Sequence, residues 1–336
     1  MPAYAPSTKE LTVLVDQEVR TFLNATEHGL ERSSPLLSEI GDLVSAGGKR
    51  IRPAFCYWGY RAVGGDHAES ILKVAASLEL LHSFALIHDD IMDASVIRRG
   101  RPTVHSRLGV GAALLVGDLA LVLADDLFMT SGFAPDVLKR AFDHYSRMRQ
   151  EVIVGQFMDL DMSGKDDVTE EDARLIARMK SGRYSVREPL LIGTALGGST
   201  APDEALIEFG ECAGEAFQLR DDLLGSFGDA AELGKPVDAD IREGKKNILF
   251  AKTVARLTGS ERDYFLGRWG TGDDLSTEEI ERLRSLISVS GALAETEAAV
   301  GELVARAESA LSTARVEEVA RAALGDLLDQ ATRWGS

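Results

Sequence analysis

The sequence "LHSFALIHDDIMD", residues 81–93, closes a long apolar stretch with three aspartates. Apolar residues recur at three- and four-residue spacing from about 67 to 92, which predicts a helix with these aspartates at its carboxyl end. The helix dipole disfavours negative charge at that end, where basic residues are usual. The aspartates therefore have either a local explanation, a solvated helix end, or a chemical one, a positive species bound among them.

The spacing of the aspartates favours the chemical explanation. Asp89 and Asp93 are four residues apart, so on a helix both carboxylates project from one face, about one turn apart. Like charges at that spacing repel each other, and a divalent cation between them removes the repulsion. Hard oxygen ligands select Mg²⁺, with water and substrate phosphate completing its shell. The preceding residues are too apolar for a free surface, so we expect the carboxylates to face a cavity.

The rest of the chain also has the pattern of helices. Helical spacing recurs at about 7–24, 110–130, 136–160, 202–224 and 291–332. The sequence contains no Asn-Gly or Asp-Gly hairpin turn between alternating runs. Pro189 lies inside a helical pattern and predicts a kink or a boundary. Because no Ser/Pro/Gly linker or fixed repeat interrupts the chain, we predict an all-α helical bundle with a single domain, residues 1–336.

Composition limits the classes of function. The chain has 336 residues, 45% of them hydrophobic, and a net charge of −17, which argues against binding to nucleic acid or to an anionic membrane. The two cysteines, Cys56 and Cys212, stand far apart in apolar surroundings and give neither a disulfide framework nor a metal-binding spacing, so a reducing compartment fits. Signal-peptide layout is lacking, and aspartates interrupt the longest apolar runs. We therefore expect a soluble cytoplasmic protein with no integral membrane segment.

A second acidic helix end occurs in "GEAFQLRDDLLGSFGD", residues 214–229. Asp221 and Asp222 repeat the first pair, but Gly225 stands at the i+4 position. One interpretation is a helix end with glycine as its stop. The other is a second acidic end that faces the first across a cavity and shares a cluster of Mg²⁺ ions around one diphosphate. Three further Asp-Asp pairs, at 125–126, 166–167 and 273–274, have surroundings typical of helix surface or loop.

Basic residues lie in loops next to these acidic ends. Taken singly, each is more often a solvated surface charge. Together they indicate a site that holds two diphosphates, one through metal and one through cations alone. The residues are Lys49, Arg50, Arg52, Arg98, Arg99, Lys180, Lys235, Lys245 and Lys246. His82 lies two turns before Asp89 on the same helix face, where it is either a core histidine or a hydrogen-bond donor to phosphate.

Six segments of the chain resemble, in order, the signature motifs of the trans-isoprenyl diphosphate synthases, also called polyprenyl synthetases. They lie within residues 47–247 and read "GGKRIRP", "LIHDDIMD" with "RRGRPTVH", "GQFMDLD", "KSGRY", "FQLRDDLLG" and "LGKPVDADIREGK". The resemblance implies the isoprenoid synthase fold, a homodimer, and a deep central cavity in each subunit. The chain looks most like a bacterial geranylgeranyl diphosphate synthase.

The resemblance also implies roles for individual residues. The metal ligands for up to three Mg²⁺ ions would be Asp89, Asp93 and Asp221. The allylic diphosphate (dimethylallyl, geranyl or farnesyl) would contact Arg98, Lys180, Ser181, Gln218, Lys235 and Lys245. Isopentenyl diphosphate would lie on Lys49, Arg52, His82 and Arg99. Two positions depart from the pattern: Gly225 replaces the last aspartate of the second motif, and Asn247 stands where threonine is usual.

The implied reaction is ionisation, condensation and elimination. Mg²⁺ and cations stabilise the departing diphosphate, the isopentenyl double bond attacks the carbocation, and a proton is lost, so no protein nucleophile is needed. Phe84, five residues before Asp89, and the small Ala85 resemble the pattern of synthases that stop near C20. Alternatives are a farnesyl or longer polyprenyl diphosphate synthase, a class I terpene cyclase, a non-catalytic partner subunit, and an acidic Ca²⁺-binding scaffold. A cyclase has no second diphosphate for the cations to hold.

Overall fold

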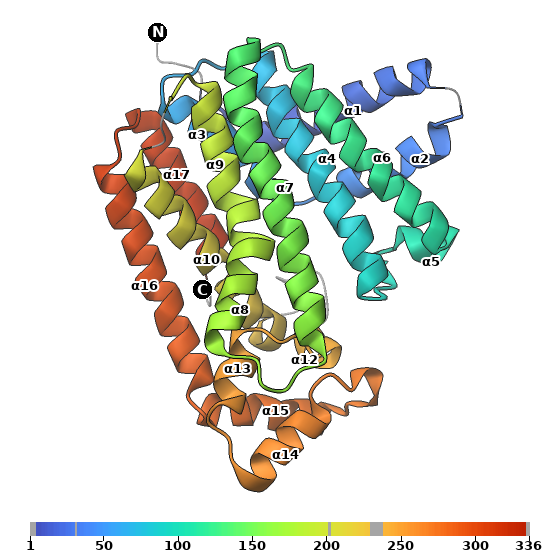
Figure 1. Ribbon diagram of the computed structural model, residues 1–336, viewed down its shortest axis with the longest axis vertical. Helices are drawn as coiled ribbons and strands as arrows, with labels where there is room; N and C mark the ends of the chain where they lie inside the picture. The colour runs from blue at the N-terminus through green and yellow to red at the C-terminus, as the bar shows by residue number, and fades with distance from the viewer. Residues whose placement is uncertain (1–4, 31, 201–202, 229–237, 334–336) are drawn as a thin grey trace. The chain divides into compact units, whose positions relative to one another are not determined.

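The computed structural model describes residues 5–30, 32–200, 203–228 and 238–333 (Figure 1). Within these residues the chain is helical, and its strands are limited to β1 (Ile97–Arg98) and β2 (Arg101–Pro102), which pair as an antiparallel hairpin. The predicted all-α class is confirmed. Contacts along the backbone divide the chain into two compact units whose segments alternate in sequence. The single domain stays a prediction, and each unit is described by itself.

Unit 1 comprises Met1–Tyr145, Pro189–Pro202 and Arg315–Leu327. Its helices are α1 (Thr8–Gly29), α2 (Ser34–Ser45), α3 (Ile51–Ala62), α4 (Glu69–Met92), α5 (Val104–Leu108), α6 (Val110–Met129), the first part of α7 (Pro135–Ser163), and most of α9 (Glu188–Leu196) and α17 (Glu318–Thr332). Helix α4 packs against α1, α3 and α6. Because neighbours cover it on several sides, its buried residues are not confined to one stripe.

Among the described residues, α4 is also the helix whose length and composition would suffice to cross a membrane. In its most apolar window, 67% of the residues are buried inside the protein. A helix that is apolar all round occurs in the core of a large protein as well as in a membrane. The packing of α4 corresponds to the first case.

The predicted boundary at Pro189 is confirmed. A π-helix, η1 (Ala177–Arg187), ends just before α9 begins at Glu188, so Pro189 lies in the first turn of α9. The Glu188 N–H still donates to the carbonyl oxygen of Arg183, so the helix continues across this boundary, and Pro189 lacks the N–H that would make the next bond. In α9, Gly193 allows close packing on α3, since a Cβ at that position would overlap the carbonyl oxygen of Cys56.

Unit 2 comprises Ser146–Glu188, Asp203–Ala314 and Leu328–Ser336. Its elements are the rest of α7, α8 (Glu170–Ile176), η1, α10 (Glu204–Phe227), α12 (Ala239–Glu243), α13 (Ile248–Val254), α14 (Gly259–Arg268), the 3₁₀ turn η2 (Gly272–Asp274), α15 (Thr277–Val289) and α16 (Ala292–Thr313). Helix α10 packs against both η1 and α16. A Cβ on Gly182 would lie 2.7 Å from the carbonyl carbon of Gly214, so η1 and α10 touch backbone to backbone.

The stretch with helical spacing at 291–332 comprises two helices, α16 and α17, with a break after Thr313. The apolar spacing continues through the break, and neither glycine nor proline marks it. The other expected helices correspond to α1, α4, α6, α7 and α10.

Candidate active site

The first acidic motif lies at the carboxyl end of α4. The helix ends at Met92, and Asp93 caps it by donating its N–H to the carbonyl oxygen of Asp89 at 2.8 Å. The Asp89 side chain is 25% exposed, whereas Asp90 is buried. The end of α4 therefore offers Asp89 and Asp93 one turn apart and turns Asp90 inward.

Asp90 fixes the position of Arg98. The hairpin of β1 and β2 carries Arg98 back toward α4, where its Nε donates to Asp90 Oδ1 at 2.6 Å and its Nη2 lies 3.6 Å from Asp89 Oδ2. Burial raises the pKa of Asp90, and the charge of Arg98 opposes this rise. Asp90 was not among the residues predicted for the site. Its position next to Asp89 could have indicated this role. Neighbouring residues on a helix point about 100° apart, so Asp90 cannot share the exposed face of Asp89 and Asp93.

The loop before α3 is held by Arg50, whose φ is +48°. Its Nε pairs with Asp16 at 2.7 Å, and its Nη1 pairs with Glu79 at 2.7 Å. Burial raises the pKa of Glu79, and Arg50 is the largest opposing charge. Arg50 is thus a structural cation inside the protein. Its neighbours Lys49 and Arg52 remain the predicted phosphate ligands of this loop.

Arg99 joins this loop to the segment that follows β1. The residue has a φ of +51°, and its Nη1 donates to the carbonyl oxygen of Leu43 at 3.1 Å. A Cβ on Gly48 would lie 2.9 Å from Arg99 Nη2 and 2.7 Å from Arg50 Nη1. Because Gly48 has no side chain, the two guanidinium groups pack directly on the loop backbone.

His82 lies within the same set of cations. Burial lowers its pKa well below the ordinary value, and Arg52 and Arg99 are the neighbouring charges that lower it most. A neutral imidazole is therefore the form present near neutral pH. The ring can donate a hydrogen bond to a phosphate oxygen, while the two arginines supply the charge. The structure thus brings together three of the four residues predicted to hold isopentenyl diphosphate.

Phe84 packs one turn below the first motif. Its ring makes an edge contact with His88, with ring centroids 4.8 Å apart. The Nε2 of His88 lies 3.2 Å from the carbonyl oxygen of Leu114 in α6. A Cβ on Gly117 would overlap the His88 ring, so glycine makes room for it. Phe84 and the neighbouring Ala85 are both half-buried.

In unit 2, Lys180 and Ser181 lie in the π-helix η1. Such helices are rare and often occur at functional sites. A Cβ on Gly155 of α7 would lie 2.5 Å from the Lys180 backbone nitrogen, so α7 and η1 touch there. One turn further along α7, Asp159 accepts a hydrogen bond from Lys180 Nζ at 2.6 Å. Asp159 was not singled out from the sequence, although it belongs to the matching segment "GQFMDLD".

The second acidic motif lies near the end of α10. Asp221 is half-buried, and Asp222 is buried. Gln218 Nε2 donates to Asp222 Oδ1 at 2.7 Å. Burial raises the pKa of Asp222 well above its ordinary value, and the nearby charge of Asp240 raises it further. Gln218, predicted to contact diphosphate, is therefore engaged with an acid of its own helix.

The segment after α10 contributes Lys245, which follows α12. Its Nζ lies 3.2 Å from Glu243 Oε2 and 3.9 Å from Asp240 Oδ1. Lys235 lies outside the described residues, so its predicted role is not placed. The acids of the two motifs belong to different units, Asp89 and Asp93 to unit 1 and Asp221 to unit 2.

The donor atoms at these ends suit Mg²⁺. Among the described residues, no three Asp, Glu, His or Cys side chains come close enough to enclose a metal ion by themselves. Mg²⁺ seldom occupies a cage made only of protein: one or two carboxylates bind it, and water and substrate phosphates complete its octahedron. The carboxylates of Asp89 and Asp93 at the end of α4 fit that mode of binding.

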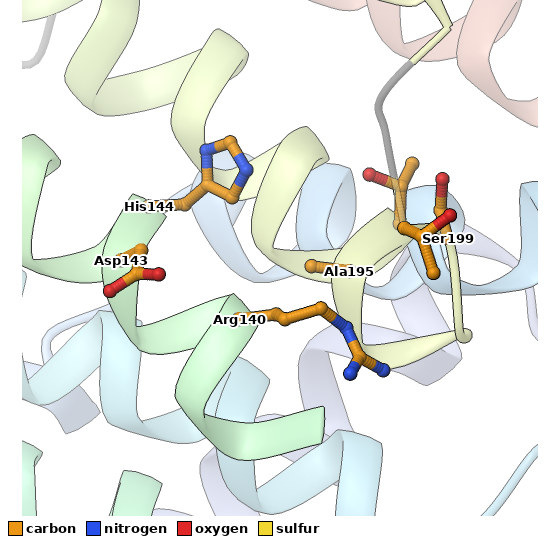
Figure 2. Close-up of a pocket in the computed structure, with 7 residues that line it drawn as sticks. Arg140, Asp143, His144, Ala195 and Ser199 are labelled. Atoms are coloured by element: carbon orange, nitrogen blue, oxygen red, sulfur yellow. The ribbon is translucent and has the colours of Figure 1, made fainter. Parts of the chain in front are cut away.

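Figure 2 shows a separate pocket in unit 1, with a volume of about 160 Å³. It is lined by Arg140, Asp143, His144, Thr194, Ala195, Ser199 and Thr200. None of these residues was predicted to be part of the site. The volume is below the roughly 300 Å³ at which small-molecule sites begin. We therefore do not place the candidate active site in this pocket.

Comparison with known proteins gives a consistent result. The family profile described as Polyprenyl synthetase matches residues 34–287. A geranylgeranyl diphosphate synthase of Saccharolobus solfataricus is 35% identical over 285 residues, which cover 83% of this chain and 82% of that protein. A short chain isoprenyl diphosphate synthase of Methanothermobacter thermautotrophicus is 35% identical over 263 residues, with coverage of 78% and 76%.

Among solved structures, geranylgeranyl pyrophosphate synthase from Corynebacterium glutamicum, complexed with isoprenyl diphosphate and magnesium, matches with a TM-score of 0.92. The identity is 33%, and the match covers 97% of this chain and 99% of that one. The chain belongs to the polyprenyl synthetase family. The predictions of the isoprenoid synthase fold and of an isoprenyl diphosphate synthase are confirmed.

Proposed function

We propose that this chain is a Mg²⁺-dependent trans-prenyltransferase that joins isopentenyl diphosphate to an allylic diphosphate and releases geranylgeranyl diphosphate, a C20 product. The observation that carries the proposal is that two cations, Arg52 and Arg99, lie near the neutral His82, in addition to the acids of the first motif. Condensation of two diphosphates needs both kinds of site. A class I terpene cyclase, the runner-up, needs only the acidic one.

Magnesium is the metal that fits the carboxylates. We assign Asp89 and Asp93 as its ligands in unit 1 and Asp221 as its ligand in unit 2, for a cluster of up to three ions. When bound, Mg²⁺ supplies the positive charge that stabilises the diphosphate as it leaves the allylic carbon. The inward-facing Asp90 takes no part in this binding and serves to hold Arg98.

The allylic diphosphate would be oriented by cations that are already in place. Arg98 is held by Asp90, and Lys180 by Asp159. Such pairs fix a long side chain before the substrate arrives, which reduces the ordering cost of binding. Ser181, Gln218, Lys235 and Lys245 complete the proposed contacts.

Isopentenyl diphosphate would bind at the loop of residues 47–52. Arg52 and Arg99 would form charge-assisted hydrogen bonds with its phosphate oxygens, and Lys49 would add a third positive charge. His82, kept neutral by burial, would donate one hydrogen bond. This arrangement holds the second diphosphate without metal, so the same site can bind a substrate that must not ionise.

The chemistry requires little else from the protein. Cations and hydrogen-bond donors stabilise the departing diphosphate, which is the main source of rate in such a reaction. Apolar walls exclude the water that would quench an allylic carbocation. The proton lost after condensation can pass to the released diphosphate, so a separate protein base is unnecessary.

Product length would be set below the first motif. Phe84 lies on α4 one turn before the acids, and its ring rests against His88. A bulky ring there limits the depth available to the growing chain, whereas the adjacent Ala85 leaves space. This arrangement supports a C20 product over the farnesyl and the longer alternatives.

We further propose a homodimer in the cytoplasm. Helix α6 exposes Leu115, Val122 and Met129 at seven-residue spacing, with exposed fractions of 61%, 55% and 52%. A regular apolar stripe of this kind is typical of a helix that packs on a partner. The free, buried thiols of Cys56 and Cys212 fit a reducing compartment. Sedimentation of the purified chain would measure the oligomeric state.

One incubation tests the function. Purified protein receives Mg²⁺, isopentenyl diphosphate and, in separate tubes, the C5, C10 or C15 allylic diphosphate, and chromatography sizes the products. We expect elongation to C20. Folded protein that elongates none of the primers would overturn the proposal, whereas cyclic hydrocarbons formed without isopentenyl diphosphate would favour the cyclase.

A further inference from the structure

The second acidic motif lacks an acid at residue 225, and the structure places another carboxylate there. Residue 225 lies within α10, one turn after Asp221. The three atoms nearest to a Cβ built on Gly225 are the carboxylate atoms of Asp240, a residue of α12, and the overlap would be severe. The Asp240 carboxylate therefore occupies the space in which a side chain at residue 225 would begin.

The second unusual residue contacts the same carboxylate. Asn247 Nδ2 donates to Asp240 Oδ2 at 3.4 Å, while its Oδ1 accepts the N–H of Phe250 at 3.2 Å and caps α13. The amide thus performs two tasks at once with its two ends. The two departures from the family's motif pattern, Gly225 and Asn247, meet at Asp240 although they lie on different elements.

Asp240 is firmly held at this position. Asp240 is only 4% exposed, and its backbone carbonyl oxygen accepts a hydrogen bond from the Lys245 N–H at 3.0 Å. It is also the neighbouring charge that acts most strongly on the buried Asp222. Burial of two carboxylates near each other is costly unless positive charge compensates them. A hydrated divalent cation beside Asp221 would provide such charge.

We propose that Asp240 supplies, from α12, the carboxylate that the second motif lacks at residue 225, and that it positions the Mg²⁺ held by Asp221. It would do so by accepting hydrogen bonds from water molecules around the ion. Gly225 is then required, because any side chain there displaces the carboxylate. The inference rests on the proposed function, and it makes Asp240 a positioning residue. Restoring the missing aspartate should therefore harm the site.

The experiment measures metal binding directly, without turnover. Thermal melting of the full chain is followed while Mg²⁺ is titrated at a fixed concentration of inorganic diphosphate, since a ligand that binds the folded state raises the melting temperature. We expect Asp240→Asn to need about tenfold or more Mg²⁺ for the half-maximal rise, the usual loss when a residue behind a metal ligand is removed. Gly225→Asp should show a similar loss and a lower melting temperature without metal.

The decisive variant relocates the acid. Gly225→Asp combined with Asp240→Ala removes the overlap and returns a carboxylate to α10, so its Mg²⁺ requirement should return to within about threefold of wild type. The matched control is Asp238→Asn, which loses an ion pair of 2.7 Å with Arg242 beside α12. That control should melt at a lower temperature with an unchanged Mg²⁺ requirement.

The possible failures are distinguishable. If wild type itself does not respond to Mg²⁺ with diphosphate, the metal site of the proposed function is wrong. If wild type responds and Asp240→Asn responds equally, only the role of Asp240 is overturned. A relocated variant that folds but stays as weak as Gly225→Asp also overturns it, and this comparison decides the matter even if Asp240→Asn does not fold.

Discussion

The two acidic helix ends begin with the same Asp-Asp pair and are completed differently. At the end of α4, Asp89 and Asp93 come from a single helix, and Asp90 holds Arg98 in place. At the end of α10, the carboxylate nearest to the fifth position of the motif is Asp240, which comes from α12. The first end is built by helical spacing alone, whereas the second depends on tertiary packing. A sequence motif can therefore describe the acids of the first helix end, but it cannot include an acid that comes from another helix.

The largest effect should come from the acids that face the substrate. We expect Asp89→Asn to lower kcat by roughly 100-fold or more, the scale of losing one preorganised electrostatic contact in the transition state. Asp221→Asn should cost about as much if the two ends act on the same diphosphate. Elongation assays with unchanged circular dichroism provide the measurement, and Asp126→Asn, at an exposed position of α6, is the control. A variant of Asp89 as active as this control would remove the metal role.

The inward-facing acids should differ between the two ends. Asp90 anchors a charged group, Arg98, while Asp222 accepts a hydrogen bond from the neutral amide of Gln218. We therefore expect Asp90→Asn to lower kcat/KM for the allylic substrate about tenfold, and Asp222→Asn about threefold. Steady-state kinetics with the allylic substrate varied would measure both. Equal losses would show that the two ends use their buried acids in the same way.

Only the end of α4 should affect product length. Phe84→Ala removes the ring that rests on His88, so the cavity below the first motif deepens and products longer than C20 should appear in the extract. Phe133→Ala, which removes a ring packed on Tyr60 elsewhere in unit 1, is the matched control and should keep the wild-type product. An unchanged product from Phe84→Ala would contradict the assignment.

The smallest effect concerns stability. Folding lowers the pKa of His82, so the unfolded chain binds more protons as the pH falls below the ordinary histidine value near 6.5. Wild type should lose about 1 kcal/mol of unfolding free energy between about pH 7.5 and about pH 5.5, relative to His82→Gln. Urea denaturation at both pH values measures this difference. Parallel pH dependence in the two proteins would show that His82 is not held neutral.

Much of the first end was predictable because its signals are local. One segment contains the apolar run, the i and i+4 acids and Phe84, and helical spacing alone relates them. The division of labour among the cations was not predictable. Arg50 forms ion pairs with Asp16 and Glu79, which are 34 and 29 residues away in sequence. Its neighbours in the same motif have the same charge, so only tertiary contacts distinguish them.

The Asp-Asp pairs at 125–126 and 166–167 also have partners that only the tertiary structure reveals. Asp166 lies 3.5 Å from Lys246, and Asp125 accepts a hydrogen bond from Tyr145 at 3.0 Å. These are structural contacts, and composition could not foresee their partners. Asp240 could not be singled out for the same reason, since it lies in α12 and its relation to Gly225 appears only when α12 packs on α10.

The π-helix η1 has a consequence for the evolution of the site. A π-helix holds an extra residue compared with an α-helix of the same length, so the directions of the side chains that follow depend on the number of residues in the segment. Deleting one residue between Ala177 and Lys180 would let the segment relax to an α-helix and turn the following side chains by about 100°. Lys180 would then leave Asp159, although no substitution had occurred. Segment length here is therefore as restrictive as residue identity.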